Sequence, residues 1–237
     1  MSHREGHQTQ DKALFRIGGA CFLAAGIIQM AGYVWNPTGI ADVFDLEPSE
    51  GIRLITLHTR KLQFVLGGQV LSYVLLIPFW LALYQALKER KRAYAMLGAA
   101  AGILDSVVVV VTGSLAAAAL TVVAQLYGSA DETNRTAALA IYYMARGATS
   151  LGGVSTALRA PTVGLTSLAL LPGQKFLRWL AWLGIGAAFL TIAELGMWII
   201  LGSPNAGVPV GVVAASLGIL WEILAAVWLL RYRPYAP

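Results

Sequence analysis

The sequence predicts an all-α polytopic membrane protein, a single bundle of six transmembrane helices in which the fourth helix is kinked or broken near Pro161. Three observations predict this class. Hydrophobic residues make up 57% of the 237 residues, and the mean hydropathy is +0.67. Only 12% of the residues are charged, whereas about 25% is usual in a soluble domain. The apolar residues also gather in stretches of about 20 or more, the length that an α-helix needs to cross a bilayer.

The predicted spans follow one another with short connections. They are residues 13–35, 62–87, 94–124, 140–171, 179–201 and 209–230. A polar leader, residues 1–12, precedes the first span, which could be mistaken for a signal peptide. That span is followed by Trp35, Asn36 and Pro37, which do not form a small-residue cleavage site, so we expect a retained helix. With no internal repeat, the whole chain, residues 1–237, is expected to form one domain.

The basic residues predict the orientation. Six spans place both termini and the second and fourth connections on one side of the membrane. Eleven basic residues lie there: Arg4, Lys12, Arg16, Lys88, Arg90, Lys91, Arg92, Lys175, Arg178, Arg231 and Arg233. Only four lie on the other side, so the positive-inside rule puts both termini in the cytoplasm. The net charge of +5 therefore reflects topology, and we expect no nucleic-acid partner.

The outer loop, residues 36–61, is the longest connection. Its first half carries four acids: Asp42, Asp45, Glu47 and Glu50. Pro48 is typical of a helix start, and Ile52 and Ile55 then recur at helical spacing. The second half of the loop, residues 51–61, is expected to form a short interfacial helix that runs into the second span.

Five ionisable residues lie inside the predicted spans: Asp105, Arg146, Arg159, Glu194 and Glu222. Each costs about 2.5 kcal/mol or more near the bilayer centre, so each needs a partner or a role. Depth, counted at about 1.5 Å per residue, predicts a central cluster of Asp105, Arg159 and Glu222 and an outer pair of Arg146 and Glu194. Three acids and two arginines leave one acid without an opposite charge, which favours its protonated form. Such an acid could carry a proton during transport or serve as a buried hydrogen-bond donor.

The fourth span has an unusual length and composition. From residue 136 to residue 171 it would extend for about 54 Å as one helix, so it must tilt, lie partly in the interface, or break. Pro161 removes a helical hydrogen bond, and Gly152 and Gly153 precede it. Backbone groups freed beside Arg159 could bind an anion, as in discontinuous transporter helices, or the proline could form a simple kink.

Motifs for catalysis and for cofactor binding are absent from the sequence. No histidine lies in a span, which excludes a histidine metal site in the bilayer, and no nucleotide-binding or nucleophile motif occurs. We therefore expect no catalytic residues, no metal and no cofactor. His58, in the outer loop beside Arg60 and Lys61, could bind an anionic headgroup or a pigment, although a lone loop histidine usually does neither. Cys21 is expected to be inert packing.

Several short motifs resemble the bacterial DUF4386 family of six-helix membrane proteins. They are the basic residue and apolar run that open the first span, Gly102-Ile103-Leu104-Asp105, Ala145-Arg146-Gly147, Phe176-Leu177-Arg178-Trp179-Leu180 and residues 220–229. The resemblance implies a compact six-helix bundle in the bacterial cytoplasmic (inner) membrane, with Asp105, Arg146 and Glu222 as shared polar positions. It supplies no catalytic residues, because the family has no settled activity. Arg159-Ala160-Pro161 departs from the family pattern.

Three functions fit these observations. The first is a non-enzymatic bundle that binds a lipophilic ligand or serves as an accessory subunit of a larger membrane complex, with membrane lipids and other membrane subunits as partners. The second is a proton-coupled small-molecule transporter that uses an intramembrane carboxylate. The third is an intramembrane enzyme that acts on lipid through two midplane acids, and it has the least support because no nucleophile or metal set accompanies them.

The six-span topology predicts that the two sides of the membrane are reached by different parts of the chain. Cysteines introduced at Ser2 and at Asn205, in the last outer loop, should react with an impermeant thiol reagent from opposite sides. Labelling of both positions from the same side would contradict six spans.

Overall fold

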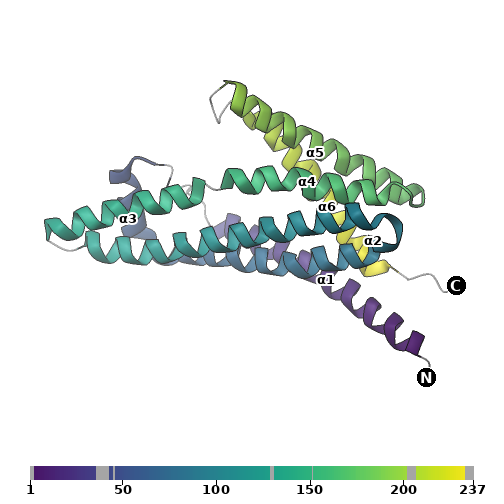
Figure 1. The fold of residues 1–237 in the computed structure, drawn as a ribbon. Helices are drawn as coiled ribbons and strands as arrows, with labels where there is room; N and C mark the ends of the chain where they lie inside the picture. The colour runs from purple at the N-terminus through teal and green to yellow at the C-terminus, as the bar shows by residue number, and fades with distance from the viewer. Residues whose placement is uncertain are drawn as a thin grey trace. The chain divides into compact units, whose positions relative to one another are not determined.

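The computed structural model describes residues 3–35, 43–44, 46–128, 131–150, 152–201 and 207–232. In this part of the chain all regular secondary structure is helical, which confirms the all-α prediction (Figure 1). The helices are α1 (His3–Trp35), α2 (Pro48–Tyr127), α3 (Glu132–Ser150), α4 (Gly152–Leu170), α5 (Lys175–Leu201) and α6 (Val208–Arg231). Ser2 and Asn205, the positions chosen for labelling, lie outside the described residues.

Four of these helices are long and apolar enough to cross a membrane: α1, through its segment Lys12–Gly32, and α2, α5 and α6. The 80 residues of α2 include two of the predicted spans, 62–87 and 94–124. Neither α3 nor α4 reaches the same combination of length and hydropathy. A set of apolar helices of this kind identifies a membrane-embedded protein, whereas the number of six transmembrane helices stays a prediction.

The chain forms two compact units, which are described separately. Unit 1 consists of Met1–Ala24, Leu75–Ser106 and Val154–Pro237, and unit 2 consists of Ala25–Val74 and Val107–Gly153. The expectation of one domain over the whole chain stays a prediction.

In unit 1 the helical chain of α2 folds back on itself. A Cβ atom on Gly102 would lie 2.6 Å from the Trp80 indole, although 22 residues of straight helix would separate these positions by about 33 Å. The direction of the chain therefore reverses between them, as two consecutive spans require. In unit 2, residues of α2 that are far apart in the sequence also meet. The Gln63 amide donates a hydrogen bond to the Thr121 hydroxyl over 2.6 Å.

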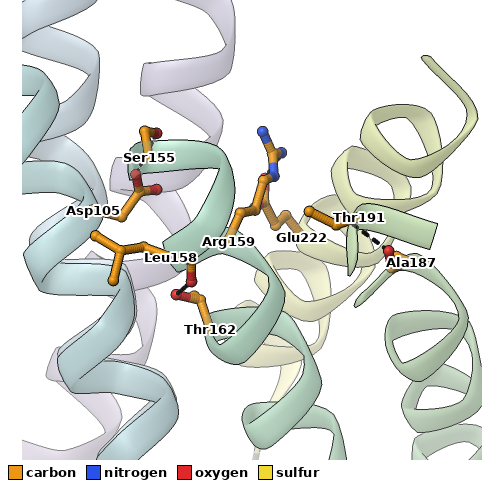
Figure 2. Close-up of polar contacts among 8 residues, drawn as sticks. All are labelled: Asp105, Ser155, Leu158, Arg159, Thr162, Ala187, Thr191 and Glu222. Atoms are coloured by element: carbon orange, nitrogen blue, oxygen red, sulfur yellow. Dashed lines mark hydrogen bonds and ion pairs between the residues drawn. The ribbon is translucent and has the colours of Figure 1, made fainter. Parts of the chain in front are cut away.

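The predicted fourth span, residues 140–171, corresponds to α3 and α4, and residue 151 between them lies outside the described residues. α4 continues through Pro161 to Leu170. The chain is therefore not broken at Pro161, and the kink predicted there stays a prediction. Packing keeps the chain helical around the proline: Ala160 and Val163 are buried, and the Thr162 hydroxyl donates a hydrogen bond to the Leu158 carbonyl over 2.7 Å (Figure 2).

The helix start predicted at Pro48 is confirmed, because α2 begins there and continues into the second predicted span. Ile52 and Ile55 are fully buried in unit 2. The Tyr142 hydroxyl of α3 lies 2.9 Å from the carbonyl oxygens of both Val43 and Leu46 and donates a shared hydrogen bond to them. This hydrogen bond links α3 to the segment just before α2. Residues 36–42 and Asp45 of that loop lie outside the described residues.

In unit 1 glycines from three helices make room for α4. A Cβ atom on Gly98 of α2 would lie 2.8 Å from the Thr166 backbone nitrogen, and one on Gly184 of α5 would overlap the Ser167 side chain. A Cβ atom on Gly218 of α6 would lie 3.6 Å from Nε of Arg159. Small residues of this kind allow helices to approach closely in a membrane. They surround a helix whose polar side chains Thr162, Thr166 and Ser167 are buried.

Replacement of Gly184 by leucine should destabilise unit 1, because the new side chain would collide with Ser167 and with the Trp221 ring. Overpacking of this kind typically costs about 1–3 kcal/mol, so the thermal unfolding midpoint of the detergent-solubilised protein should fall. Gly186→Leu, two residues along the same helix, is the matched control, since nothing lies within 4 Å of a Cβ atom there. Equal midpoints for the two variants would contradict the close approach at Gly184.

Candidate polar site in unit 1

Four of the five predicted site residues lie in unit 1, each on a different helix. Asp105 lies on α2, Arg159 on α4, Glu194 on α5 and Glu222 on α6. Arg146 lies on α3 in unit 2. Figure 2 shows Asp105, Arg159 and Glu222 in unit 1, with the residues of α4 between the helices that carry the two acids.

Arg159 and Glu222 form an ion pair. Nη2 of Arg159 lies 3.4 Å from both carboxylate oxygens of Glu222, at the long end of hydrogen-bond distances. The Glu222 side chain is 11% exposed and that of Arg159 is 31% exposed. Gly218, one turn before Glu222 on α6, leaves the space that the arginine occupies. A pair this enclosed is costly to break, because removal of one partner leaves the other charge buried.

Asp105 contacts the same helix one turn before Arg159. The Ser155 hydroxyl of α4 donates a short hydrogen bond to the Asp105 carboxylate, which is buried (Figure 2). Asp105 also interacts electrostatically with Arg159 and with Glu222. Ser155 and Arg159 are four residues apart, so they project from neighbouring positions on one side of α4. Sequence reasoning missed Ser155, although its four-residue spacing from Arg159 could have indicated it.

A small polar pocket opens between α4, α5 and α6. Its volume is about 120 Å³. One turn of each helix supplies its lining: Thr156 and Arg159 from α4, Thr191 and Glu194 from α5, and Gly211 and Ala215 from α6. Of these residues sequence reasoning identified Arg159 and Glu194. The others carry no charge, and no signal in the sequence marks them as neighbours.

Two glycines leave room for the Glu194 side chain in the pocket: Gly211 of α6, and Gly207, the residue that precedes α6. A Cβ atom on Gly207 would lie 3.1 Å from Cγ of Glu194, and one on Gly211 would overlap the carboxylate itself. Within the described ranges, no hydrogen bond or ion pair joins the Glu194 carboxylate. The expected outer pair of Glu194 with Arg146 stays a prediction, because the two residues belong to different units.

The chemistry of the site is that of charge and hydrogen bonding. In the part of the chain that the structure describes, no group of three or more His, Cys, Asp or Glu side chains is arranged to hold a metal ion. His58 lies on α2 within unit 2, and Cys21 is half-buried on α1. The site can therefore hold a polar or charged group of a ligand, or store a proton on a carboxylate.

Comparison with known proteins gives one match. A family model described as a domain of unknown function (DUF4386) matches residues 14–232, which confirms the resemblance seen in the sequence. Searches of curated proteins and of solved structures found no match.

Arg159→Leu should lower the stability of the detergent-solubilised protein, because it leaves the Glu222 carboxylate buried without its cation. Loss of one partner of such a pair costs roughly 3 kcal/mol or more. A second substitution, Glu222→Leu or Asp105→Leu, should restore part of the loss in thermal unfolding measurements. Arg178→Leu, at an exposed position of α5, is the control and should have little effect. A neutral Arg159→Leu variant would show that the ion pair contributes nothing to stability.

Proposed function

Because the chain belongs to the DUF4386 family, whose description states no function, we propose a function from the site itself. The protein binds a lipophilic ligand within the membrane, and the pocket between α4, α5 and α6 holds the polar head of that ligand. The observation that supports this proposal is a pocket with charged and hydroxyl side chains between α4 and two helices, α5 and α6, that are apolar enough to span a membrane.

The surroundings of the pocket suit an amphiphilic ligand. Exposed apolar side chains flank the lining residues on both apolar helices, among them Ile192 on α5 and Val212 on α6. A hydrocarbon chain against these residues would remain in an apolar environment while its head entered the pocket. A polar group without a hydrogen-bond partner is costly in lipid, so the pocket offers the head group partners that the bilayer centre does not.

The size of the pocket sets the size of the head. Pockets that enclose a whole drug-sized molecule measure about 300–1,000 Å³, well above the 120 Å³ found in unit 1. A head group of a few non-hydrogen atoms fits, and the body of the ligand stays outside.

For the membrane context we infer six transmembrane helices in a bacterial cytoplasmic membrane, with both termini in the cytoplasm. The support is the concentration of basic residues at the termini and at the second and fourth connections. An accessory role in a larger membrane complex agrees with the same bundle, and partner subunits that copurify in mild detergent would support it.

A second candidate function is proton-coupled transport. In its favour, unit 1 brings the carboxyl groups of Asp105 and Glu222 around one arginine of α4, with Glu194 at the adjoining pocket. Acids in excess of cations in an apolar setting can bind and release protons. Substrate-dependent proton movement into sealed vesicles that disappears in Glu222→Gln would support this candidate, and its absence would favour ligand binding alone.

Filling of the pocket should displace the ligand. Ala215→Phe places a ring in the pocket, and Ala100→Phe makes the same change at an exposed position of α2 in unit 1. Organic extracts of the proteins, purified in a mild detergent, are compared by mass spectrometry. We expect a lipophilic species in wild type and in Ala100→Phe that is depleted in Ala215→Phe, and identical extracts from all three would contradict ligand binding at this pocket.

A further inference from the structure

The two charged residues that line the pocket differ in their partners. Arg159 has the Glu222 carboxylate at 3.4 Å, and Asp105 adds a second negative charge within electrostatic range. Glu194 has no cation beside it in the described part of unit 1. The positive charge at the pocket is therefore already compensated within the protein, whereas the negative charge of Glu194 is not.

The carboxylate of Glu194 lies against the backbone of the neighbouring segment. Gly207 and Gly211 are one helical turn apart, and both lie against this glutamate. A larger residue at position 211 would occupy the place of the carboxylate oxygens. The absence of side chains at both positions leaves room for the carboxylate in the pocket wall.

Thr191 also lines the pocket and carries a hydroxyl that can accept a hydrogen bond. Thr191 is one turn before Glu194 on α5, and its proton is donated to the Ala187 carbonyl over 3.0 Å (Figure 2). A hydroxyl carries one proton and two lone pairs, so its lone pairs remain for a ligand. Thr191 and Glu194 thus form a wall of hydrogen-bond acceptors, which matches a ligand that carries donors.

We propose that the pocket binds the ammonium head of a lipophilic amine, with N–H groups donated to the Glu194 carboxylate and to Oγ1 of Thr191. This inference rests on the proposed function and names the chemical class of its ligand. A primary ammonium group is small enough for the pocket and has three N–H donors. Hydrogen bonds between ionised partners are about twice as strong as neutral ones, and the apolar surroundings strengthen them further.

An anionic head fits the same pocket less well. Its natural partner would be Arg159, which would have to leave Glu222 or share its charge. Separation of that pair would leave the largely buried Glu222 carboxylate without compensation, a costly change. The anion would also face the carboxylate of Glu194 across a small space.

The test uses three amphiphiles with the same twelve-carbon chain and different heads: dodecylammonium, dodecanol and dodecyl sulfate. The full-length protein is placed in phosphatidylcholine nanodiscs, and binding of each radiolabelled amphiphile is measured against empty nanodiscs. Dodecylammonium should bind most tightly to wild type. Glu194→Gln, which keeps the shape but removes the charge, should weaken its binding about tenfold or more, and Glu194→Asp should retain most of it.

Two further variants serve as a second test of the binding groups and as a control. Thr191→Val keeps the shape of the side chain, removes the second acceptor and should weaken dodecylammonium binding several-fold. Glu89→Gln, at an exposed acid of α2 in unit 1, should leave it unchanged. The folding of each variant is assessed from the fraction of the protein that elutes as a single species in gel filtration.

The outcomes separate this inference from the proposed function. Equal binding of all three amphiphiles, abolished by Ala215→Phe, would overturn the ammonium inference and leave ligand binding intact. Dodecyl sulfate binding more tightly than dodecylammonium would also overturn the inference. Binding that Ala215→Phe does not change would overturn both proposals.

Discussion

The enclosure of α4 by the other helices of unit 1 is the constraint on which the polar site depends. This helix carries Arg159 and a series of hydroxyl side chains, and it is not among the helices apolar enough to span a membrane unaided. Gly98, Gly184 and Gly218 allow α2, α5 and α6 to approach it closely. Because α2, α5 and α6 pack around α4, the charged side chains can lie among helices that are apolar enough to span a membrane.

The hydrogen bonds of α4 are of two kinds. Thr162 and Thr166 donate their hydroxyl protons to carbonyl oxygens one turn earlier in the same helix, so these groups are satisfied without help from a neighbour. At Gly184 the packing is different, because Oγ of Ser167 and Nε1 of Trp221 are buried and have no hydrogen-bond partner in the described part of the chain. An unsatisfied buried group costs about 1–3 kcal/mol. The contact of α4 with α5 and α6 at this point therefore depends on shape complementarity.

The sequence was sufficient for the helical class, whereas the depth of the charged residues in the membrane stays a prediction. Depth could be counted because the rise per residue of an α-helix is nearly constant, and Arg159 does lie beside Glu222. The rotation of each helix about its axis is not contained in the length of a span, so Ser155, Thr191 and Gly211 could not be assigned to the site. The break in the fourth span was expected at Pro161 because a proline removes a hydrogen bond. α4 nevertheless continues through Pro161, where buried neighbours such as Ala160 and Val163 compensate for that loss.

The enclosure of a polar helix also bears on how the protein is made. A helix with a central arginine enters the bilayer alone only at a cost of several kcal/mol. The α5 and α6 segments that cover Arg159 and supply its carboxylate partner are C-terminal to α4, so the ribosome completes them later. The ion pair of α4 can therefore form only once α6 has been made, and a product that ends at Leu170 would hold Arg159 without its Glu222 partner. Such a fragment has the character of a substrate for membrane quality control.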